Sequence, residues 1–567
     1  MKKFKSILCL ALAGLSMSSC KDFLTLMPLN EIVLENFWTD KSDVESVLLG
    51  TYSALEKSDC VVRMSIWGEM RSDNIVAGKS NDENDDIILI TKDNILETNS
   101  YSKYKCFYDV INRANTVLHF APIVAGEDPN YNYDELKNNE AEAIAIRSLC
   151  YWYLIRAYKD VPYVTEPSID DTHDFFVGQM KFDQILDSLI TDLESYKGWA
   201  VNRYTVEAAN TARFTRSAMY AMLADMYLWK GDYDKCIENC ELVTERKLFE
   251  YDELIRKDSK NCTVELFNGY PLITDVITGT EGGNSYNEIF GKGNSFETLF
   301  ELPYDSETKN PFVESYYNSK NSTIGKLKAF TDVGSGFGPN GNVVFTSPTD
   351  GRYFQNVKQA DSEYGIMKYV YEDITYDLSD ANGNPGDAFE ATKRENTQPN
   401  WIIYRYSDVL LMEAEAKVQK AAQMGADTAS TEVKTLLTEA FNLVDAVNSR
   451  AIAKEQNGDA SKPLKVTDYK TVTAMDNLVL AERRRELLFE GKRWFDLVRM
   501  SMREGNTSRL LSFVTKKHSD ATSSAVQIRL SEMNALFFPL HKDEIKINSK
   551  LIQNPIYVEN EDIQKAK

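Results

Sequence analysis

The chain has 567 residues, of which 43% are hydrophobic and 26% are charged, a composition typical of a folded globular protein. Its 64 lysines and arginines are outnumbered by 86 acidic residues, which gives a formal net charge of -22. This charge disfavours binding to a nucleic-acid backbone. Only four histidines are present, so histidine-based metal sites and catalytic triads have little support.

Residues 1–19 have the pattern of an export signal. Lysines near the start are followed by an apolar run over residues 7–17. This run is too short to span a bilayer, which needs about 20 apolar residues. The small residues before Cys20 resemble the lipobox of bacterial lipoproteins, in which the leader is cut off and the cysteine is acylated. We therefore predict a lipid anchor at Cys20; an ordinary secretory signal is the alternative.

The N-terminal half of the chain is predicted to be helical. Apolar residues recur at helical spacing over Glu140–Tyr158 and Arg213–Trp229. Gly231 and Asp232 interrupt the second pattern, and another helix follows from Tyr233. Two antiparallel helices with so short a connection resemble a tetratricopeptide (TPR) repeat. No strict period of about 34 residues runs along the chain, so the predicted array is irregular.

Six cysteines remain once Cys9, in the leader, and Cys20 are set aside. No two of them have the C-x-x-C spacing, which excludes zinc ribbons and thioredoxin-like motifs. Cys236 and Cys240 lie one helical turn apart, a spacing that is more typical of a buried helix face than of a disulfide. A disulfide framework is the less favoured alternative.

The segment 265–400 differs from its flanks because it holds 15 of the 27 glycines. Runs such as Gly334–Gly338 predict turns and loops with short strands at most. Loops on a rigid frame commonly carry binding sites, so we expect the ligand here. A variable surface insert without a ligand is the alternative.

The predicted loops contain many aromatic residues. Such rings have apolar faces and polar edges that match the C–H faces and hydroxyl groups of sugars. Each ring taken singly is still more typical of packing than of a ligand platform. These loop aromatics are Tyr101, Tyr270, Tyr286, Phe312, Tyr316, Tyr317, Phe337 and Tyr353.

Helical periodicity returns after Trp401. Three consecutive arginines at 483–485 lie among glutamates, and the spacing allows Glu482–Arg485 and Glu490–Arg493 pairs. This predicts a salt-bridged helix rather than contact with nucleic acid. The predicted elements are helices over Tyr404–Val418, Glu432–Arg450 and Leu478–Met500, and an extended tail over Leu536–Val558.

Motifs for catalysis, cofactors and metals are not found. The sequence has no GxxxxGK[ST] and no GxSxG. A stretch from Asp380 begins like a calcium loop, but Pro385 replaces the required glycine and Ala391 the closing acid. We therefore expect no catalytic residues, no cofactor and no metal. A glycosidase is the disfavoured alternative, because its paired carboxylates are defined by spatial separation.

Short motifs follow one another in a distinctive order along the chain. Lys21–Pro28 comes after the leader and Trp67–Asn74 follows. The most specific motifs are Tyr404–Ala416 and Glu482–Leu497, and Phe538–Leu540 comes near the end. In this order they resemble the SusD/RagB family of outer-membrane nutrient-binding lipoproteins of Bacteroidetes, over nearly the whole chain after the leader.

This resemblance implies a mainly α, SusD-like fold: a right-handed helical frame of four irregular TPR-like helix pairs with a loop-rich, ligand-binding insert. We expect a signal peptide (1–19), an N-terminal helical region (20–264), the insert (265–400) and a C-terminal helical region (401–567). The resemblance also implies a non-catalytic, lipid-anchored protein on the outer-membrane surface. It would bind glycans and deliver them to a SusC-like TonB-dependent transporter.

The resemblance says little about individual ligand residues, since these vary with the ligand. Its signature residues Arg485, Glu486 and Asp496 are expected to pair within the frame. The expected ligand residues combine loop aromatics with neighbouring donors and acceptors: Arg71, Asp73, Asn74, Tyr101, Tyr286, Tyr316, Tyr317 and Phe337.

Two alternative functions stay open. The same architecture could capture peptides, as the RagB branch suggests, and an acidic surface would then favour basic ones. Salt dependence of binding separates this alternative from neutral glycan binding. The second alternative is a TPR-type assembly scaffold with no ligand of its own.

Overall fold

The fold is described from a computed structural model of the chain. The structure describes residues 37–78, 85–169, 176–278, 281–317, 324–335, 344–345, 347, 349–360, 362–377, 389–394, 398–426, 430–452 and 463–558. The leader, Cys20 and Phe337 lie outside the described residues, so the predictions made for them stay predictions.

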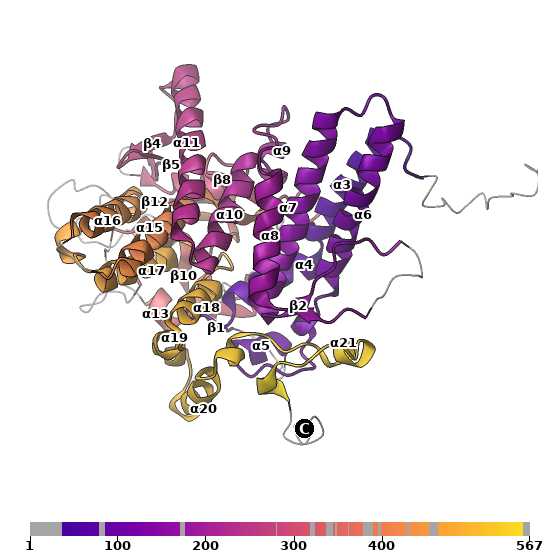
Figure 1. Ribbon diagram of the computed structural model, residues 1–567. Coiled ribbons are helices and arrows are strands. Elements are labelled where there is room, and N and C mark those ends of the chain that lie inside the picture. Colours follow the sequence, from indigo (N-terminus) through magenta and orange to yellow (C-terminus); the bar gives the residue numbers. More distant parts are fainter. Residues whose placement is uncertain are drawn as a thin grey trace, which may run out of the picture.

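Long helices of the N-terminal part pack side by side (Figure 1). The predicted helix Glu140–Tyr158 is confirmed, but it begins earlier. Asn132 accepts a hydrogen bond from the backbone N–H of Glu135, whose side chain accepts one from the backbone of Asn132. This reciprocal cap satisfies N–H groups that an uncapped helix end would leave unpaired. The helices are α3 (Lys41–Glu56), α4 (Ser58–Glu69), α6 (Lys105–Glu127), α7 (Tyr133–Tyr158) and α8 (Phe182–Tyr196).

The helix pair predicted around Gly231 is also confirmed. α10 (Arg216–Lys230) ends at Gly231, which has a φ of 81° in the left-handed region that glycine favours. Asp232 then caps α11 (Tyr233–Asp258) by accepting a 3.2 Å hydrogen bond from the backbone N–H of Lys235. Because the turn is so short, α10 and α11 pack against each other.

The helix predicted over Leu478–Met500 is wrong, because two helices occupy this stretch. α17 (Val472–Glu486) and α18 (Arg493–Glu504) are joined by a turn. Within the turn, Phe489 and Gly491 have φ values of 65° and 72°, which a continuous right-handed helix does not contain. The two helices predicted before it are confirmed as α15 (Tyr406–Gln423) and α16 (Thr431–Ala451), which pack together.

The central segment forms several small antiparallel sheets among the described residues. The largest has the strand order β13-β12-β7-β6, and the others have two strands each. The strands are β1 (Ile75–Ala77), β2 (Val161–Pro162), β3 (Gln179–Met180), β4 (Val264–Phe267), β5 (Tyr270–Ile273), β6 (Val276–Thr278), β7 (Glu281–Gly282), β8 (Thr298–Leu302), β9 (Leu327–Ala329), β10 (Val357–Ala360), β11 (Glu363–Ile366), β12 (Tyr371–Asp377), β13 (Glu390–Lys393) and β14 (Trp401–Arg405).

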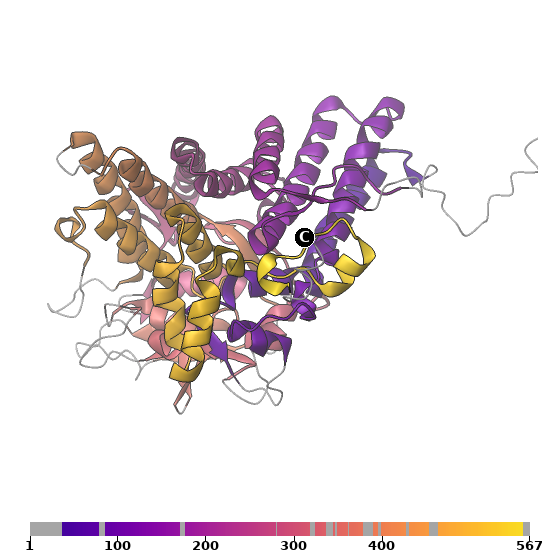
Figure 2. The same cartoon turned by 60° about the horizontal axis from the view of Figure 1, so that its bottom comes forward.

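The C-terminal segment returns to the N-terminal helices, as Figure 2 shows from below. The backbone N–H of Phe538 donates a 2.8 Å hydrogen bond to the carbonyl of Ala157 at the end of α7. The predicted extended tail is therefore docked, and a short α-helix and a 3-10 turn, Pro555–Tyr557, interrupt it. The remaining helices are α5 (Asp86–Thr91), α9 (Ala209–Ala212), α12 (Asn284–Tyr286), α13 (Thr331–Gly334), α14 (Gly351–Asn356), α19 (Ser508–Val514), α20 (Asp520–Leu530) and α21 (Lys542–Ile547).

One hydrophobic core runs through the helical frame and the insert. Cys236 and Cys240 are buried in it with free thiols, as predicted, and so are Cys60 and Cys150. Among the described residues, no helix combines the length and apolar character needed to cross a bilayer.

Candidate functional site

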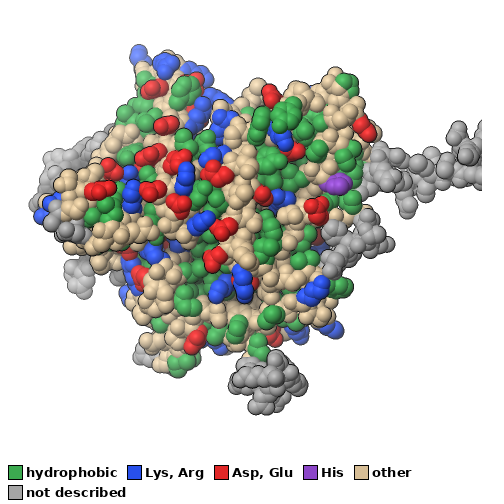
Figure 3. Space-filling model, in the orientation of Figure 1, with side chains coloured by type: hydrophobic (Ala, Val, Ile, Leu, Met, Phe, Trp, Pro, Cys, Tyr) green, Lys and Arg blue, Asp and Glu red, His purple; other side chains and the backbone are tan. Residues whose placement is uncertain are grey.

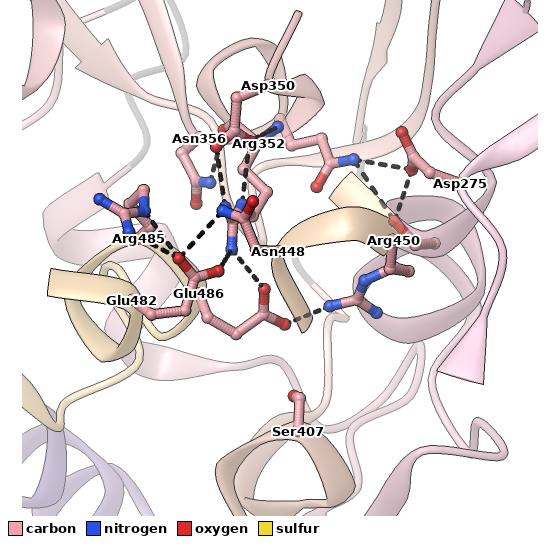
Figure 4. A network of polar contacts seen from close by, with 12 residues as sticks. Asp275, Asp350, Arg352, Asn356, Ser407, Asn448, Arg450, Glu482, Arg485 and Glu486 are labelled. Atoms are coloured by element: carbon pink, nitrogen blue, oxygen red, sulfur yellow. Dashed lines mark hydrogen bonds and ion pairs between the residues drawn. The ribbon is translucent and has the colours of Figure 1, made fainter. Parts of the chain in front are cut away.

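The signature residues of the C-terminal motifs form a buried network of ion pairs (Figure 4). Glu486 pairs with Arg352 at 3.1 Å, with Arg405 at 2.6 Å and also with Arg450. Burial alone would raise the pKa of Glu486, but the three guanidinium groups outweigh it and hold that pKa well below its usual range. Glu482 pairs with Arg485 at 2.7 Å, as predicted. These side chains tie the insert to β14, α16 and α17.

The predicted Glu490–Arg493 pair is wrong because these residues do not share a helix. Glu490 lies in the turn before α18 and pairs with Arg405 and Lys368 at 2.8 and 2.7 Å. Asp496 pairs with Arg483 at 2.9 Å, which confirms its expected place within the frame. The signature charges therefore have structural partners.

Arg71, Asp73 and Asn74 are buried, with side chains that serve the frame rather than an open surface. Asp73 pairs with Arg493 at 2.8 Å and with Arg484 at 3.1 Å. Burial raises the pKa of Asp73, but the two arginines reverse this effect and lower it far below its usual value.

Arg71 pairs with Asp93 at 2.8 Å, and its guanidinium group lies 4.2 Å from the ring centre of Trp494. Two of its N–H groups donate to the carbonyls of Ala535 and Leu536. The expectation that Arg71, Asp73 and Asn74 face a ligand is therefore corrected: their hydrogen-bonding groups are used to join α4 to the C-terminal part.

Three predicted loop tyrosines are also corrected. Tyr286 and Tyr317 are 0% exposed and Tyr316 is 8% exposed. The Tyr286 hydroxyl donates to the carbonyls of Met367 and Tyr371, and the Tyr317 hydroxyl to that of Phe489. Glycine-rich flanks predicted open loops, yet these tyrosines lie in helical turns that pack inward.

Tyr101 is the one predicted ligand residue with partial exposure in the described part of the chain. Its hydroxyl is hydrogen-bonded to that of Tyr316 at 2.5 Å, which joins two segments 215 residues apart. Burial, and then the neighbouring Tyr316 hydroxyl, raise the pKa of Tyr101, so this phenol stays neutral and able to donate. Beside it, Lys326 pairs with Asp85 at 3.0 Å.

Strands β1 and β9 organise this region. Ile75 pairs with Ala329 and Ala77 with Leu327 in an antiparallel register. This pairing brings together the segments expected near the site, around residues 71–77, 101 and 316. Most of the side chains predicted to bind the ligand are nevertheless buried.

Further along β9 and on the elements next to it, more side chains are partly exposed. Lys328 pairs with Glu363, and Phe330 follows the strand. Tyr353 donates a 2.9 Å hydrogen bond to the carbonyl of Gly334. Together these residues form what we call the β1–β9 face: Asp85, Tyr101, Lys326, Lys328, Phe330, Tyr353, Glu363 and Tyr364.

Of the residues of the β1–β9 face, only Tyr101 was predicted from the sequence to bind the ligand. Lys326, Lys328 and Glu363 carry no sequence motif, and a strand pairing between residues near 76 and 328 leaves no local signal. The face offers aromatic rings beside lysine–carboxylate pairs. In the described part of the chain, no group of three or more His, Cys, Asp or Glu side chains could hold a metal ion.

Comparisons with known proteins agree with this architecture. A family model described as the SusD family matches residues 312–557, and one described as "starch-binding associating with outer membrane" matches residues 22–228. SusD-like protein P38 of Formosa agariphila is 27% identical over 535 residues, which cover 88% of this chain and 92% of that protein. SusD-like protein P25 of the same organism is 24% identical over 531 residues, with 88% and 90% covered.

Solved structures share the fold. A SusD superfamily protein from Bacteroides vulgatus has a TM-score of 0.63 at 17% identity and covers 92% of this chain and 100% of its own. A putative sugar binding protein from the same species has a TM-score of 0.62 at 20% identity, with 92% and 99% covered. SusD-type family models thus match two long segments of the chain, and its SusD-like relatives are similar to it over most of its length.

Proposed function

We propose that the protein is a non-catalytic receptor for glycans on the outer-membrane surface, which passes them to a SusC-like TonB-dependent transporter. A lipid on Cys20 would hold it at the membrane, and oligo- or polysaccharides would bind on the β1–β9 face. The family description, with its starch binding and outer-membrane association, supports the general class.

The observation that carries this proposal is the composition of the β1–β9 face. Tyr101, Phe330 and Tyr364 offer partly exposed rings, which suit the apolar faces of sugar rings. The Lys326–Asp85 and Lys328–Glu363 pairs offer charged donors and acceptors next to those rings. Sites for small ligands commonly combine apolar surface with a few well-placed polar groups.

Support for a binding rather than catalytic role comes from the carboxylates of the face. Asp85 and Glu363 are each neutralised by a lysine. Acid–base hydrolysis of glycosides needs two carboxyl groups on either side of one bond, with one of them held protonated. On the β1–β9 face both carboxyl groups are instead held in ion pairs, Asp85 with Lys326 and Glu363 with Lys328.

The proposal is tested with the double variant Y101A/K326A. We expect glycan affinity to fall at least tenfold, about 1.4 kcal/mol, because a ring and a charged donor are removed from the face. The matched control is Y133A/K465A, which removes one exposed tyrosine and one exposed lysine elsewhere. Calorimetric titration gives the affinities.

Thermal unfolding shows whether each variant stays folded, since Tyr101 also bonds to Tyr316. Unchanged affinity in a folded Y101A/K326A protein would place glycan binding elsewhere.

A further inference from the structure

A second open site lies among α9, α10 and α11, well apart from β1 and α13 (Figure 1). It is a groove of about 650 Å³ between the segment leading into α9, the start of α10, the second half of α11 and the loop before β8. Ligand pockets in proteins commonly have volumes of about 300–1,000 Å³. We call it the α9–α11 groove and define it by Arg203, Thr211, Lys247, Arg256, Lys257 and Phe296.

The floor of the α9–α11 groove is polar, and three of its hydroxyl-bearing residues, Thr211, Ser295 and Thr298, are buried. The Thr211 hydroxyl donates to the side-chain oxygen of Asn294 at 2.7 Å, and the hydroxyls of Ser295 and Thr298 are 2.9 Å apart. Beneath them Glu301 accepts a 2.7 Å hydrogen bond from the backbone N–H of Asn294. These bonds fix the orientation of the floor before any ligand arrives, which lowers the ordering cost of binding.

The acidic side chains of the groove already have partners. Glu207 and Glu253 both pair with Arg203, at 3.0 and 3.4 Å. Glu250 pairs with the buried Lys247 at 2.8 Å and with Arg246 at 2.9 Å. The carboxylates of the groove are thereby neutralised.

Two cations at the rim are left over. Arg256 and Lys257 are exposed, and neither has an ion pair within the described residues. Figure 3 shows Lys and Arg side chains gathered around the upper end of the molecule, over α11. The groove is lined by four cations, Arg203, Lys247, Arg256 and Lys257, and by three carboxylates, Glu207, Glu250 and Glu253. This lining has a net charge of +1 in a chain whose net charge is -22, and it would attract anions.

We propose that the α9–α11 groove binds an acidic sugar unit, one that carries a carboxylate or a sulfate group. The rim cations Arg256 and Lys257 meet the acidic group, while the hydroxyl and amide floor hydrogen-bonds the sugar hydroxyls. Phe296, whose ring lies 4.8 Å from the ammonium group of Lys247, adds apolar surface. This site is separate from the β1–β9 face, so the protein has a second contact for charged glycans.

A small inorganic anion would need only the rim. The polar floor and the Phe296 ring are features that a sugar can use and a bare phosphate or sulfate cannot. The volume also exceeds what one such ion requires. The groove therefore favours a saccharide that carries the charge over a free anion.

The test is calorimetric titration of the full chain after the leader, with Cys20→Ser so that it stays in solution. The probes are trigalacturonate, a sulfated chondroitin disaccharide, inorganic sulfate and neutral maltotriose. The groove variant is R256A/K257A. Its charge-matched control is K465A/K470A, which removes two exposed lysines far along the chain near α17.

We expect R256A/K257A to lose at least tenfold in affinity for trigalacturonate or the sulfated disaccharide, while K465A/K470A binds like the unaltered chain. Comparing these two probes shows whether the groove takes the carboxylate or the sulfate. Rising salt should weaken binding of the charged probe. Equal affinity for maltotriose and the charged probes would overturn the proposal, as would unchanged binding by R256A/K257A or equally tight binding of inorganic sulfate.

The two proposals can fail separately, because the groove variant and the face variant alter different sites. If Y101A/K326A abolishes trigalacturonate binding and R256A/K257A does not, the acidic sugar binds on the β1–β9 face and the groove proposal fails alone. If neutral glycans never bind but the charged probe binds in the groove, the function proposed for the face fails and the groove proposal stands.

Discussion

Glu486 shows how single residues hold this frame together. Its carboxylate faces Arg352, Arg405 and Arg450, which come from α14, β14 and α16. A buried carboxylate is costly without partners, and here three cations from distant segments supply them. One side chain in α17 therefore couples the insert to two helices of the C-terminal part.

We predict that Glu486→Gln lowers the free energy of unfolding by about 3 kcal/mol, because it leaves buried guanidinium groups short of one negative charge. The loss stays near the lower end of the range for such pairs since each arginine keeps another carboxylate partner. Denaturant unfolding measures it. The control E372Q makes the same change at an exposed position and should stay within about 0.5 kcal/mol. Equal effects in the two variants would contradict the structural role of the network.

Glu69 gives a pH-dependent test at the same scale. Burial raises its pKa from 4.5 to about 7, although Asn74 and Ser72 donate hydrogen bonds to it. Between pH 4.5 and about pH 7, the Glu69 carboxyl is protonated in the folded chain and ionised in the unfolded chain. The free energy of unfolding therefore falls as the pH rises through this window.

We expect the contribution of Glu69 to the free energy of unfolding to decrease by about 1–3 kcal/mol between pH 5 and pH 8. Glu69→Gln cannot titrate, so its stability relative to the unaltered chain should improve over the same interval. Urea unfolding of both proteins at the two pH values gives the double difference. A difference that does not change with pH would mean that Glu69 titrates normally in the folded chain.

At the scale of elements, α4 meets the turn between α17 and α18 at two glycines, Gly68 and Gly491. A Cβ added to Gly68 would lie 1.8 Å from the backbone oxygen of Gly491, which is far too short for a non-bonded contact between carbon and oxygen. Gly491 itself has a φ of 72°, which favours glycine. The helix and the turn can meet this closely because Gly68 lacks a side chain, and Gly491 permits the left-handed backbone of the turn.

We predict that Gly68→Ala destabilises the protein by about 3 kcal/mol, since backbone atoms must separate to admit the methyl group. Gly50→Ala is the matched control, because Gly50 also lies inside a helix and its added Cβ meets nothing within 4 Å. That control should gain about 0.5–1 kcal/mol from better helix propensity. Thermal and denaturant unfolding separate the two variants, and a neutral Gly68→Ala would refute the contact.

The same elements show what local sequence can and cannot predict. α7, α10 and α15 were predictable because their apolar periodicity and end signals are local. The break between α17 and α18 was missed because apolar residues continue through Leu487 and Leu488, while the left-handed backbone of Phe489 leaves no periodic signal.

The candidate site was harder to predict for a physical reason. Burial of Tyr286, Tyr316 and Tyr317 depends on tertiary packing, which glycine-rich flanks do not encode. The sequence did predict that the segments around Tyr101 and Tyr316 belong to one region, and their hydroxyl groups are hydrogen-bonded to each other. Lys326 and Asp85 meet only through long-range strand pairing, so the sequence alone gave no reason to select them.

At the scale of the whole molecule, both ends of the chain build one frame. Phe538 bonds to Ala157, and Arg71 in the N-terminal part is held by carbonyls of Ala535 and Leu536. The ordered motifs resemble those of the SusD/RagB family because this frame depends on them. In Figure 1, α9 and α11 lie well apart from β1.

The measurement that tests the central claim most directly is titration of the soluble chain with a panel of polysaccharides and host glycans, combined with chromatography of the glycans afterwards. We predict saturable binding of at least one glycan, with its length distribution unchanged after prolonged incubation. Time-dependent release of shorter sugars would contradict the non-catalytic assignment, and failure to bind any member of a broad panel would contradict the glycan receptor itself.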